Sequence, residues 1–188
     1  MTNELIGIIK NVAVTFGLSP GNVASFVEVE TGGKGFSVDG KITIQFEPAW
    51  FKKQAPFAPS GLWSVNKVDV QVKEWTAFND AFAKNPTAAM LSTSIGLGQI
   101  MGFHYKRLGY NTVGEMWDDA KKGLDRQIWQ LCKCISTDIK LKSCLLAGDW
   151  DGVATLFNGA GYKALAAKYG REPYNISMAK AAKKYATL

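Results

Sequence analysis

The chain has 188 residues, of which 47% are hydrophobic and 20% charged, and its formal net charge is +6. This length and apolar content exclude a disordered or fibrous protein and predict a globular fold that buries its own core. The positive charge permits an anionic partner, such as an acidic envelope polymer. No nucleic-acid-binding motif accompanies it, so nucleic acid is not an expected partner.

The N-terminal segment predicts a helix over residues 3–16. Its apolar side chains recur at helical spacing: Leu5, Ile8, Ile9, Val12 and Phe16. Lys10 and Asn11 interrupt the apolar stretch, so the segment does not resemble a cleavable secretory signal. No apolar run reaches the length of a transmembrane span.

A second helix is expected to begin at Ser19-Pro20, with serine as N-cap and proline at the first helical position. Its apolar residues lead to Glu30, and Gly32 stands where a left-handed cap would end it. The following Asp39-Gly40 predicts a tight turn between short strands at residues 36–38 and 42–46.

Downstream, the sequence predicts a helix from Pro48, a loop over residues 56–63, and a helix over residues 70–84. From residue 86 onward it predicts helices joined by short glycine turns, including residues 150–157, 161–169 and 175–186. A long apolar stripe is formed by Leu124, Ile128, Leu131, Ile135 and Ile139. The expected class is mainly α (α+β), with one small β-hairpin near the N-terminus.

The three cysteines, Cys132, Cys134 and Cys144, cannot all pair, which argues against a disulfide framework. Sulfurs two residues apart on a helix point in different directions, and the single histidine, His104, stands in another segment. We therefore expect buried structural thiols, no metal site and no cofactor.

Glu30 is the first candidate for chemistry. It ends an apolar helix, and apolar surroundings would raise its pKa and keep it protonated as a general acid. On local features alone, a surface glutamate is an equal alternative. Glu28 points to another face of the helix and is expected to be solvated.

Two further segments are ambiguous when taken alone. Residues 92–102 are rich in small residues around the amide of Gln99, which is typical either of a ligand-binding helix entry or of a purely structural one. Asn158 can end a helix in a left-handed turn or bind the acetamido group of a sugar.

The order of these segments is more specific than any one of them. The chain has Val-Glu-Thr-Gly-Gly-Lys-Gly-Phe at residues 29–36, Asp-Gly at 39–40, Phe-Glu at 46–47, Ser-Ile-Gly-Leu-Gly-Gln-Ile-Met-Gly at 94–102 and Phe-Asn-Gly-Ala-Gly-Tyr at 157–162. This pattern resembles the lysozyme superfamily, with its goose-type lysozymes and lytic transglycosylases. It is most similar to the N-acetylmuramidase family found in phage endolysins. The resemblance runs from about residue 22 to 175.

The sequence departs from that family's pattern at two places. Pro48-Ala49 follow Phe46-Glu47, where a basic residue and a histidine are expected. Phe157 stands where a tyrosine is expected before Asn-Gly, so a hydroxyl is missing there. Neither departure touches Glu30, but the first bears on the role of Glu47.

The resemblance implies a lysozyme-like fold with two lobes around a cleft. Glu30 would protonate the glycosidic oxygen between N-acetylmuramic acid and N-acetylglucosamine. Glu47 would act as base or charge stabiliser, with Asp39 as an alternative better explained by its turn. The glycan-contacting residues implied are Gln45, Ser94, Gln99, Asn158 and, as a cleft wall, Tyr162.

These inferences predict a single monomeric catalytic domain over residues 1–188, with a hairpin part at about 20–65, a helical lobe at about 70–188 and no separate wall-binding module. The implied setting is a phage endolysin that accumulates in the host cytoplasm and reaches the periplasmic cell wall when a holin opens the membrane. Its partners would be peptidoglycan and an anionic outer envelope.

Two alternatives stay open at this point. A lytic transglycosylase would use the same Glu30 and form 1,6-anhydromuramic products. A wall-binding or virion structural protein would keep the fold without turnover.

Overall fold

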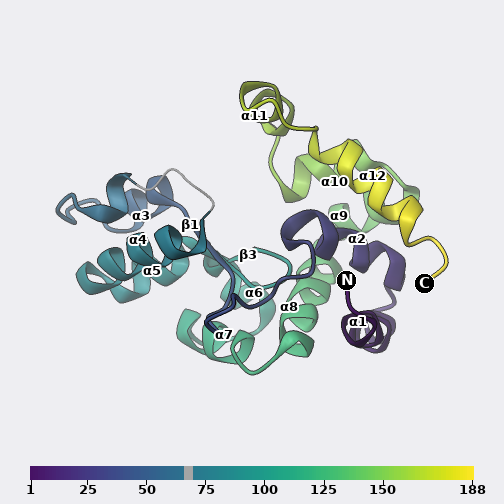
Figure 1. Cartoon of the computed structure of the whole chain (residues 1–188), viewed down its shortest axis with the longest axis horizontal. Coiled ribbons are helices and arrows are strands. Elements are labelled where there is room, and N and C mark those ends of the chain that lie inside the picture. Colours follow the sequence, from purple (N-terminus) through teal and green to yellow (C-terminus); the bar gives the residue numbers. More distant parts are fainter. Residues whose placement is uncertain (66–69) are drawn as a thin grey trace. The chain divides into compact units, whose positions relative to one another are not determined.

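The computed structural model describes residues 1–65 and 70–188 (Figure 1). The described residues are mainly helical and include a three-stranded antiparallel sheet, which confirms the predicted mainly α class. The chain divides into two compact units. The first unit comprises Met1–Gly33 and Leu131–Leu188, and the second comprises Lys34–Gln130. Helix α8 (Leu124–Thr137) contributes residues to both units.

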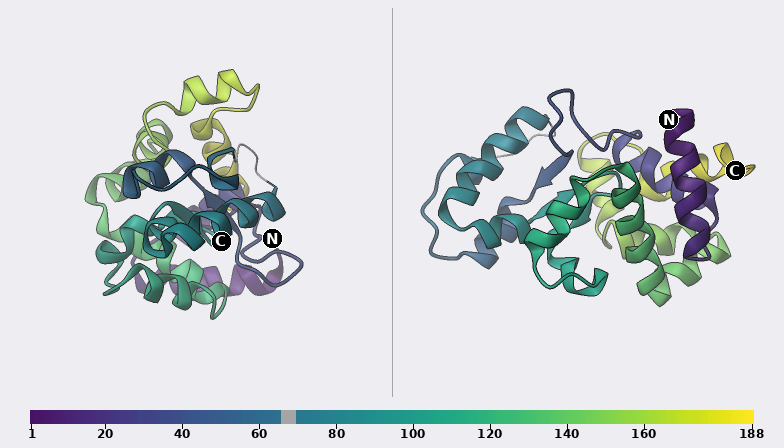
Figure 2. Two further views of the ribbon diagram at one scale, coloured as in Figure 1. Left: turned by 90° about the vertical axis from the view of Figure 1, so that its left-hand side faces the viewer. Right: turned by 90° about the horizontal axis from the view of Figure 1, so that it is seen from below.

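The described elements of the first unit are helices (Figure 2). Besides the end of α8, they are α1 (Asn3–Thr15), α2 (Pro20–Thr31), α9 (Ile139–Ala147), α10 (Trp150–Phe157), α11 (Tyr162–Lys168) and α12 (Tyr174–Lys184). Helix α2 packs against α1 and α12, and α12 also packs against α10. The buried side chains include Leu5, Ile9, Val23, Phe26, Val27, Leu131, Ile135, Val153 and Met178. The apolar faces of α1, α2 and α12 therefore share one core.

The five helices of this unit that were predicted with residue ranges, α1, α2, α10, α11 and α12, agree with those ranges within two residues. Helix α2 begins at Pro20 after Ser19 in the N-cap position, although the Ser19 side chain makes no cap hydrogen bond. It ends at Gly32, whose φ of 59° is left-handed, and the Gly32 N–H donates to the Glu28 carbonyl at 3.0 Å. Glycine adopts this conformation without a Cβ clash, so the chain turns sharply just after Glu30.

The apolar stripe predicted through Ile139 is shorter than expected. Helix α8 stops at Thr137, and the Asp138 carboxylate accepts the N–H of Leu141 at 3.0 Å as the N-cap of α9. Ile139 is consequently 80% exposed, so its assignment to the stripe is wrong. The reason is that the cap starts a new helix whose face no longer follows the old period.

The second unit combines helices with the sheet. Its elements are β1 (Ile44–Phe46), α3 (Pro48–Gln54), η1 (Leu62–Val65), α4 (Gln71–Lys84), α5 (Pro86–Leu91), β2 (Thr93–Ile95), β3 (Ile100–Met101), η2 (Gly102–His104), α6 (Tyr105–Leu108), α7 (Val113–Ala120) and the start of α8. Its buried side chains include Ile44, Phe46, Phe51, Trp63, Phe78, Ile95, Leu97, Met116, Trp117 and Ile128. A core of its own thus stabilises this unit.

The predicted hairpin at residues 36–46 requires a correction. Asp39-Gly40 does form a turn, with Gly40 at φ 75°, and one antiparallel bridge, Phe36 to Ile42, joins its two arms. The Ser37 N–H donates to the Lys41 carbonyl at 2.7 Å and the Thr43 N–H to the Gly35 carbonyl at 2.9 Å, but within residues 35–46 the pairing extends no further. Strand β1 instead pairs with β2, and β2 pairs with β3. The hairpin therefore lies at residues 93–101, which we expected to open a helix. The Asp39-Gly40 pair predicts the turn correctly, but local residues cannot predict that β1 pairs with β2, about fifty residues further along the chain.

Side chains of α4 hold the outer edge of β1. The Gln71 amide accepts the Ile44 N–H at 3.0 Å and donates to the Ile44 carbonyl at 2.8 Å. The buried Glu74 carboxylate accepts the Phe46 N–H at 2.9 Å. These bonds replace a fourth strand, since a strand edge otherwise leaves its backbone groups unpaired. Strand β1 is therefore held by β2 on one edge and by α4 side chains on the other, which fixes the backbone just before Glu47.

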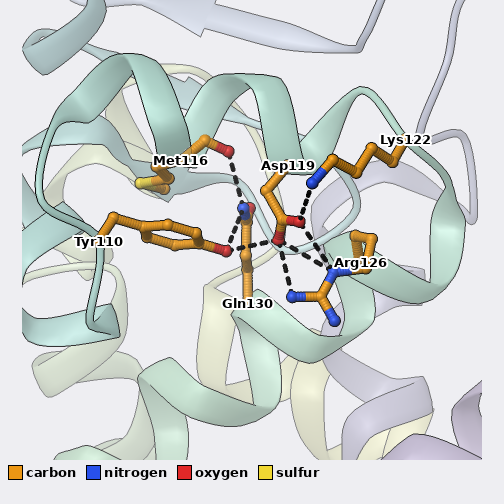
Figure 3. A network of polar contacts seen from close by, with 6 residues as sticks. All are labelled: Tyr110, Met116, Asp119, Lys122, Arg126 and Gln130. Atoms are coloured by element: carbon orange, nitrogen blue, oxygen red, sulfur yellow. Dashed lines mark hydrogen bonds and ion pairs between the residues drawn. The ribbon is translucent and has the colours of Figure 1, made fainter.

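A second polar network links α7 and α8 in this unit (Figure 3). Asp119 accepts a bond from the Tyr110 hydroxyl at 2.6 Å and two from the Arg126 Nε at 3.0 Å, and Lys122 lies at 3.2 Å. Burial pushes the pKa of Asp119 up, but the hydrogen bonds from Arg126, Tyr110 and Lys122 outweigh it and hold the pKa below its usual range. Gln130 donates to the Tyr110 oxygen at 3.1 Å, so the network reaches along α8.

The cysteines are thiols rather than disulfides, and Cys132 and Cys134 are buried as expected, whereas Cys144 is half-buried. Burial raises the pKa of Cys132 to about 12. Within residues 1–65 and 70–188, no group of His, Cys, Asp and Glu side chains has the arrangement of a metal site. No helix among those residues combines the length and apolar character that a bilayer span requires.

Candidate active site

Glu30 lies in the last turn of α2, on the helix face that carries Phe26 one turn earlier. Phe26 is fully buried, and its ring contacts that of Phe157 from α10 with centroids 4.6 Å apart. Phe157 in turn stacks on Tyr174, the first residue of α12, with centroids 6.5 Å apart. Three aromatic rings from three helices therefore form a connected row, and its last member, Tyr174, contacts the Glu30 carboxyl.

The Tyr174 hydroxyl donates a hydrogen bond to Oε1 of Glu30. Burial raises the pKa of Glu30 from about 4.5 to about 7, and the bond from Tyr174 offsets part of that rise. Burial, together with the charge of Glu30, holds the pKa of Tyr174 well above its ordinary range, so the phenol keeps its proton. The prediction that Glu30 lies in apolar surroundings with a raised pKa agrees with this geometry.

Glu28 has a different environment two residues earlier on α2. It accepts bonds from Lys184 and Tyr185, each at 2.7 Å. These two bonds hold the pKa of Glu28 below its usual range. Glu28 does point to another face, but it is bound to α12 rather than simply solvated, because α12 packs along α2.

In the second unit, three predicted residues, Gln45, Glu47 and Ser94, lie together on or beside strands β1 and β2. Gln45 is exposed in the middle of β1 and lies opposite Ser94 of β2. Its amide donates to Oε1 of Glu47 at 3.1 Å, and the Glu47 N–H donates to the Ser92 carbonyl at 2.9 Å. Glu47 occupies the N-cap position of α3 without making a side-chain cap bond. The strand end and the Gln45 amide together orient the Glu47 carboxylate.

Ser94 and Gln99 stabilise the turn between β2 and β3. The Ser94 hydroxyl donates to the Gln99 amide oxygen at 2.9 Å, and the Gln99 nitrogen donates to the Gly96 carbonyl at 2.9 Å. Gln99 has a φ of 46°, which is uncommon for a residue with a Cβ. Gly96 has a φ of 69°, and a Cβ there would meet the Gln127 side chain at 3.0 Å. The small residues of this segment thus allow a tight turn against α8.

Asn158 and Tyr162 belong to the first unit. Asn158 ends α10 in a right-handed conformation, and the left-handed turn falls on Gly159 at φ 103°, so Asn158 does not supply a left-handed cap. Tyr162 is buried, and its hydroxyl donates to Asp151 at 2.6 Å. This bond fixes the ring at the start of α11.

Comparison with known proteins shows the family of this chain. A family model described as "Muramidase: N-acetylmuramidase" matches residues 19–186, nearly the whole chain. The chain belongs to the N-acetylmuramidase family. It is therefore a member of a family of lysozyme-type glycoside hydrolases, as the sequence motifs predicted.

One solved structure is similar to this family member over almost its full length. The crystal structure of the Burkholderia phage AP3 endolysin aligns with a TM-score of 0.78 and 26% sequence identity. The alignment covers 96% of this chain and 70% of the endolysin chain. No curated protein matches the sequence significantly.

Tyr174 is the residue at this site that sequence reasoning missed. The predicted final helix began at residue 175, one position too late, and Tyr174 stands 144 residues from its partner Glu30. No motif or spacing links two positions so far apart. The one available signal was Pro173, which often precedes or opens a helix and would have moved the helix start to Tyr174.

Proposed function

We propose that this chain is a phage endolysin that hydrolyses the β-1,4 bond between N-acetylmuramic acid and N-acetylglucosamine, with Glu30 as the general acid. One observation carries the proposal: Glu30 is half-buried at the end of α2 against the Tyr174 hydroxyl, and burial raises its pKa to about 7. A carboxyl with this pKa is about half protonated at neutral pH. It can therefore give a proton to the glycosidic oxygen as the C–O bond breaks.

The family and the similar structure support the biological setting. Membership of the N-acetylmuramidase family supports a peptidoglycan substrate, and the likeness to a phage endolysin supports host lysis as the role. The net charge of +6 would favour an anionic envelope. In this proposal the protein accumulates in the host cytoplasm and reaches the wall after a holin opens the membrane.

The second carboxylate in the proposal is Glu47. Its support is local: the Gln45 amide binds Oε1 at 3.1 Å, so the carboxylate has a defined orientation at the end of β1. Such a group can orient the attacking water or stabilise the oxocarbenium-like transition state. The residues proposed to contact the glycan are Gln45, Ser94, Gln99, Asn158 and Tyr162.

The test is mass spectrometry of the fragments released from purified peptidoglycan. Hydrolysis should give fragments that end in reducing N-acetylmuramic acid, and Glu30→Gln should lower their release about 10²- to 10⁴-fold while the protein stays folded. Glu28→Gln is the matched control, because it lies on the same helix and should keep the release rate.

Other outcomes would contradict the proposal in distinct ways. Products that end in 1,6-anhydromuramic acid would identify a lytic transglycosylase. Undiminished release by Glu30→Gln would place the acid elsewhere. No release by the wild-type protein, together with binding to the wall, would favour a non-catalytic wall-binding protein.

A further inference from the structure

One oxygen of the Glu30 carboxyl has a defined hydrogen-bond partner. Oε1 accepts the hydrogen bond of Tyr174. A protonated carboxyl carries its proton on one oxygen and accepts on the other. Because Tyr174 is itself a donor that keeps its proton, it favours the form in which Oε1 accepts and Oε2 holds the proton.

We propose that Tyr174 is the positioning residue of Glu30, which it holds so that Oε2 delivers the proton to the substrate. The inference rests on the proposed function of Glu30. In the reaction, the proton moves from Oε2 to the glycosidic oxygen, which also takes the electron pair of the breaking C–O bond. Water then adds its oxygen to the anomeric carbon, and its released proton restores the acid.

The bond from Tyr174 strengthens as the reaction proceeds. Before proton transfer it joins a phenol to a neutral carboxyl. After transfer the acceptor is a carboxylate, and charge-assisted hydrogen bonds are about twice as strong as neutral ones. An interaction that grows toward the transition state accelerates the reaction, whereas one of constant strength does not. Tyr174 therefore does more than fix a rotamer.

The aromatic rings hold the Tyr174 hydroxyl in register with Glu30. The Tyr174 ring stacks on Phe157, and Phe157 contacts Phe26, which lies one turn before Glu30 on the same helix. A shift of α12 along α2 would thus disturb the rings and the hydrogen bond together. Phe26 and Phe157 have no hydroxyl, so Tyr174 is the member of this stack that can donate.

The charged groups on the helices around α2 are bound elsewhere or exposed, whereas the Glu30 carboxyl has Tyr174 as its hydrogen-bond partner. On α12, Lys184 and Tyr185 bind Glu28, and Lys180 binds Glu172. On α10, Asp151 is bound by Lys163 and Tyr162.

On α1, both Glu4 and Lys10 are exposed. The shift in the pKa of Glu30 has two causes, burial and Tyr174. A change at Tyr174 should therefore appear directly in the titration of Glu30.

The experiment compares Tyr174→Phe with the matched variant Tyr185→Phe, which removes a phenol–glutamate bond from the same pair of helices. Tyr174→Phe should lower kcat/KM on purified peptidoglycan about 10- to 100-fold. It should also shift the alkaline limb of the pH profile upward by about one unit, since the bond stabilises the ionised carboxyl. Tyr185→Phe should leave the rate and the profile unchanged.

A direct titration separates this inference from the activity assay. The pKa of Glu30 can be followed by NMR on protein with ¹³C-labelled glutamate, with the Glu30→Gln spectrum as assignment. Tyr174→Phe should raise this pKa. Fluorotyrosine incorporated at position 174 keeps the ring and has a more acidic phenol, so it should lower the pKa and serves if Tyr174→Phe folds poorly.

The outcomes are distinguishable from failure of the proposed function. If Glu30→Gln is inactive but both changes at position 174 leave the Glu30 titration and kcat/KM unaltered, Tyr174 is not a positioning residue. If Glu30→Gln remains active, Glu30 is not the acid and the inference is overturned with it.

Discussion

Tyr174, the first residue of α12, donates its hydroxyl to Glu30 in the last turn of α2, and Tyr185 at the end of α12 donates to Glu28 on the same helix. The two carboxyls lie two residues apart, yet their pKa values shift in opposite directions. Glu28 has Lys184 as a cationic partner and its pKa falls, whereas burial of Glu30 raises its pKa to about 7. A raised pKa keeps a carboxyl protonated near neutral pH, which is what a general acid requires.

The first prediction concerns the pH dependence of catalysis. In the proposed mechanism Glu30 must be protonated to act, and burial raises its pKa to about 7. We therefore expect kcat/KM to decline tenfold per pH unit once the pH rises well above 7. Initial rates on purified peptidoglycan between pH 5 and 9 measure this. A rate that stays constant over that range would show that Glu30 does not limit the reaction.

The second prediction concerns stability. A carboxyl whose folded pKa is raised stabilises the fold below its unfolded pKa of about 4.5, and this contribution is lost as the pH rises through about 7. Glutamine cannot ionise, so Glu30→Gln should be more stable than wild type by about 1–3 kcal/mol at pH 8 and equally stable near pH 4. Urea unfolding at the two pH values measures the difference.

Glu28→Gln provides the opposite case as a control. The pKa of Glu28 is lowered, so its ionised form stabilises the fold above its unfolded pKa, and the substitution should destabilise the protein at pH 8. Equal effects of the two substitutions at pH 8 would contradict the assignment of burial as the cause at Glu30.

The third prediction separates Asn158 from its neighbour. Asn158 has an ordinary right-handed conformation, whereas Gly159 has a φ of 103°. Because this conformation is available to any residue, Asn158→Ala should change the melting temperature little. It should lower turnover, because the proposed contact between the Asn158 amide and the glycan is lost. Gly159→Ala should cost about 1–2 kcal/mol of stability because of the left-handed backbone. Unchanged turnover per folded molecule in Asn158→Ala would assign Asn158 a structural role.

The fourth prediction concerns Glu47. Glu47→Ala should strongly reduce the release of reducing ends without unfolding the protein, because water attack loses its base or charge stabiliser. Asp39→Ala is the control, since Asp39 binds Ser37 and Lys41 within its turn. A harmless Glu47→Ala combined with 1,6-anhydro products would favour a transglycosylase mechanism.

The fifth prediction concerns the Asp119 network. Asp119→Ala should destabilise the protein by about 2–3 kcal/mol, because it leaves Arg126 and Tyr110 without their acceptor. This figure is below that of a fully buried pair because the Arg126 side chain is 34% exposed. The neighbouring Asp118→Ala, which loses an exposed pair with Lys121, should change stability by less than about 0.5 kcal/mol. Equal losses would contradict a special role for the buried carboxylate.

Some features of this protein follow from the sequence alone. The helical periods, the proline and glycine at the ends of α2, and the place of Glu30 in the last turn of this helix are all local, so neighbouring residues suffice to predict them. The ordered set of motifs sufficed to predict the family, which the match over residues 19–186 confirmed.

Other features depend on partners far apart in the chain. Strand β1 pairs with β2 and is held by α4, so the hairpin predicted from the Asp39-Gly40 turn forms only one bridge. Tyr174 reaches Glu30 because α12 packs along α2, and no local pattern encodes that contact. Backbone propensities and turn residues act over a few positions. Strand pairing and burial, in contrast, depend on the free energy of packing the whole core. The sequence therefore singled out Glu30 as the candidate acid, and the tertiary structure decided its pKa and its hydrogen-bond partner.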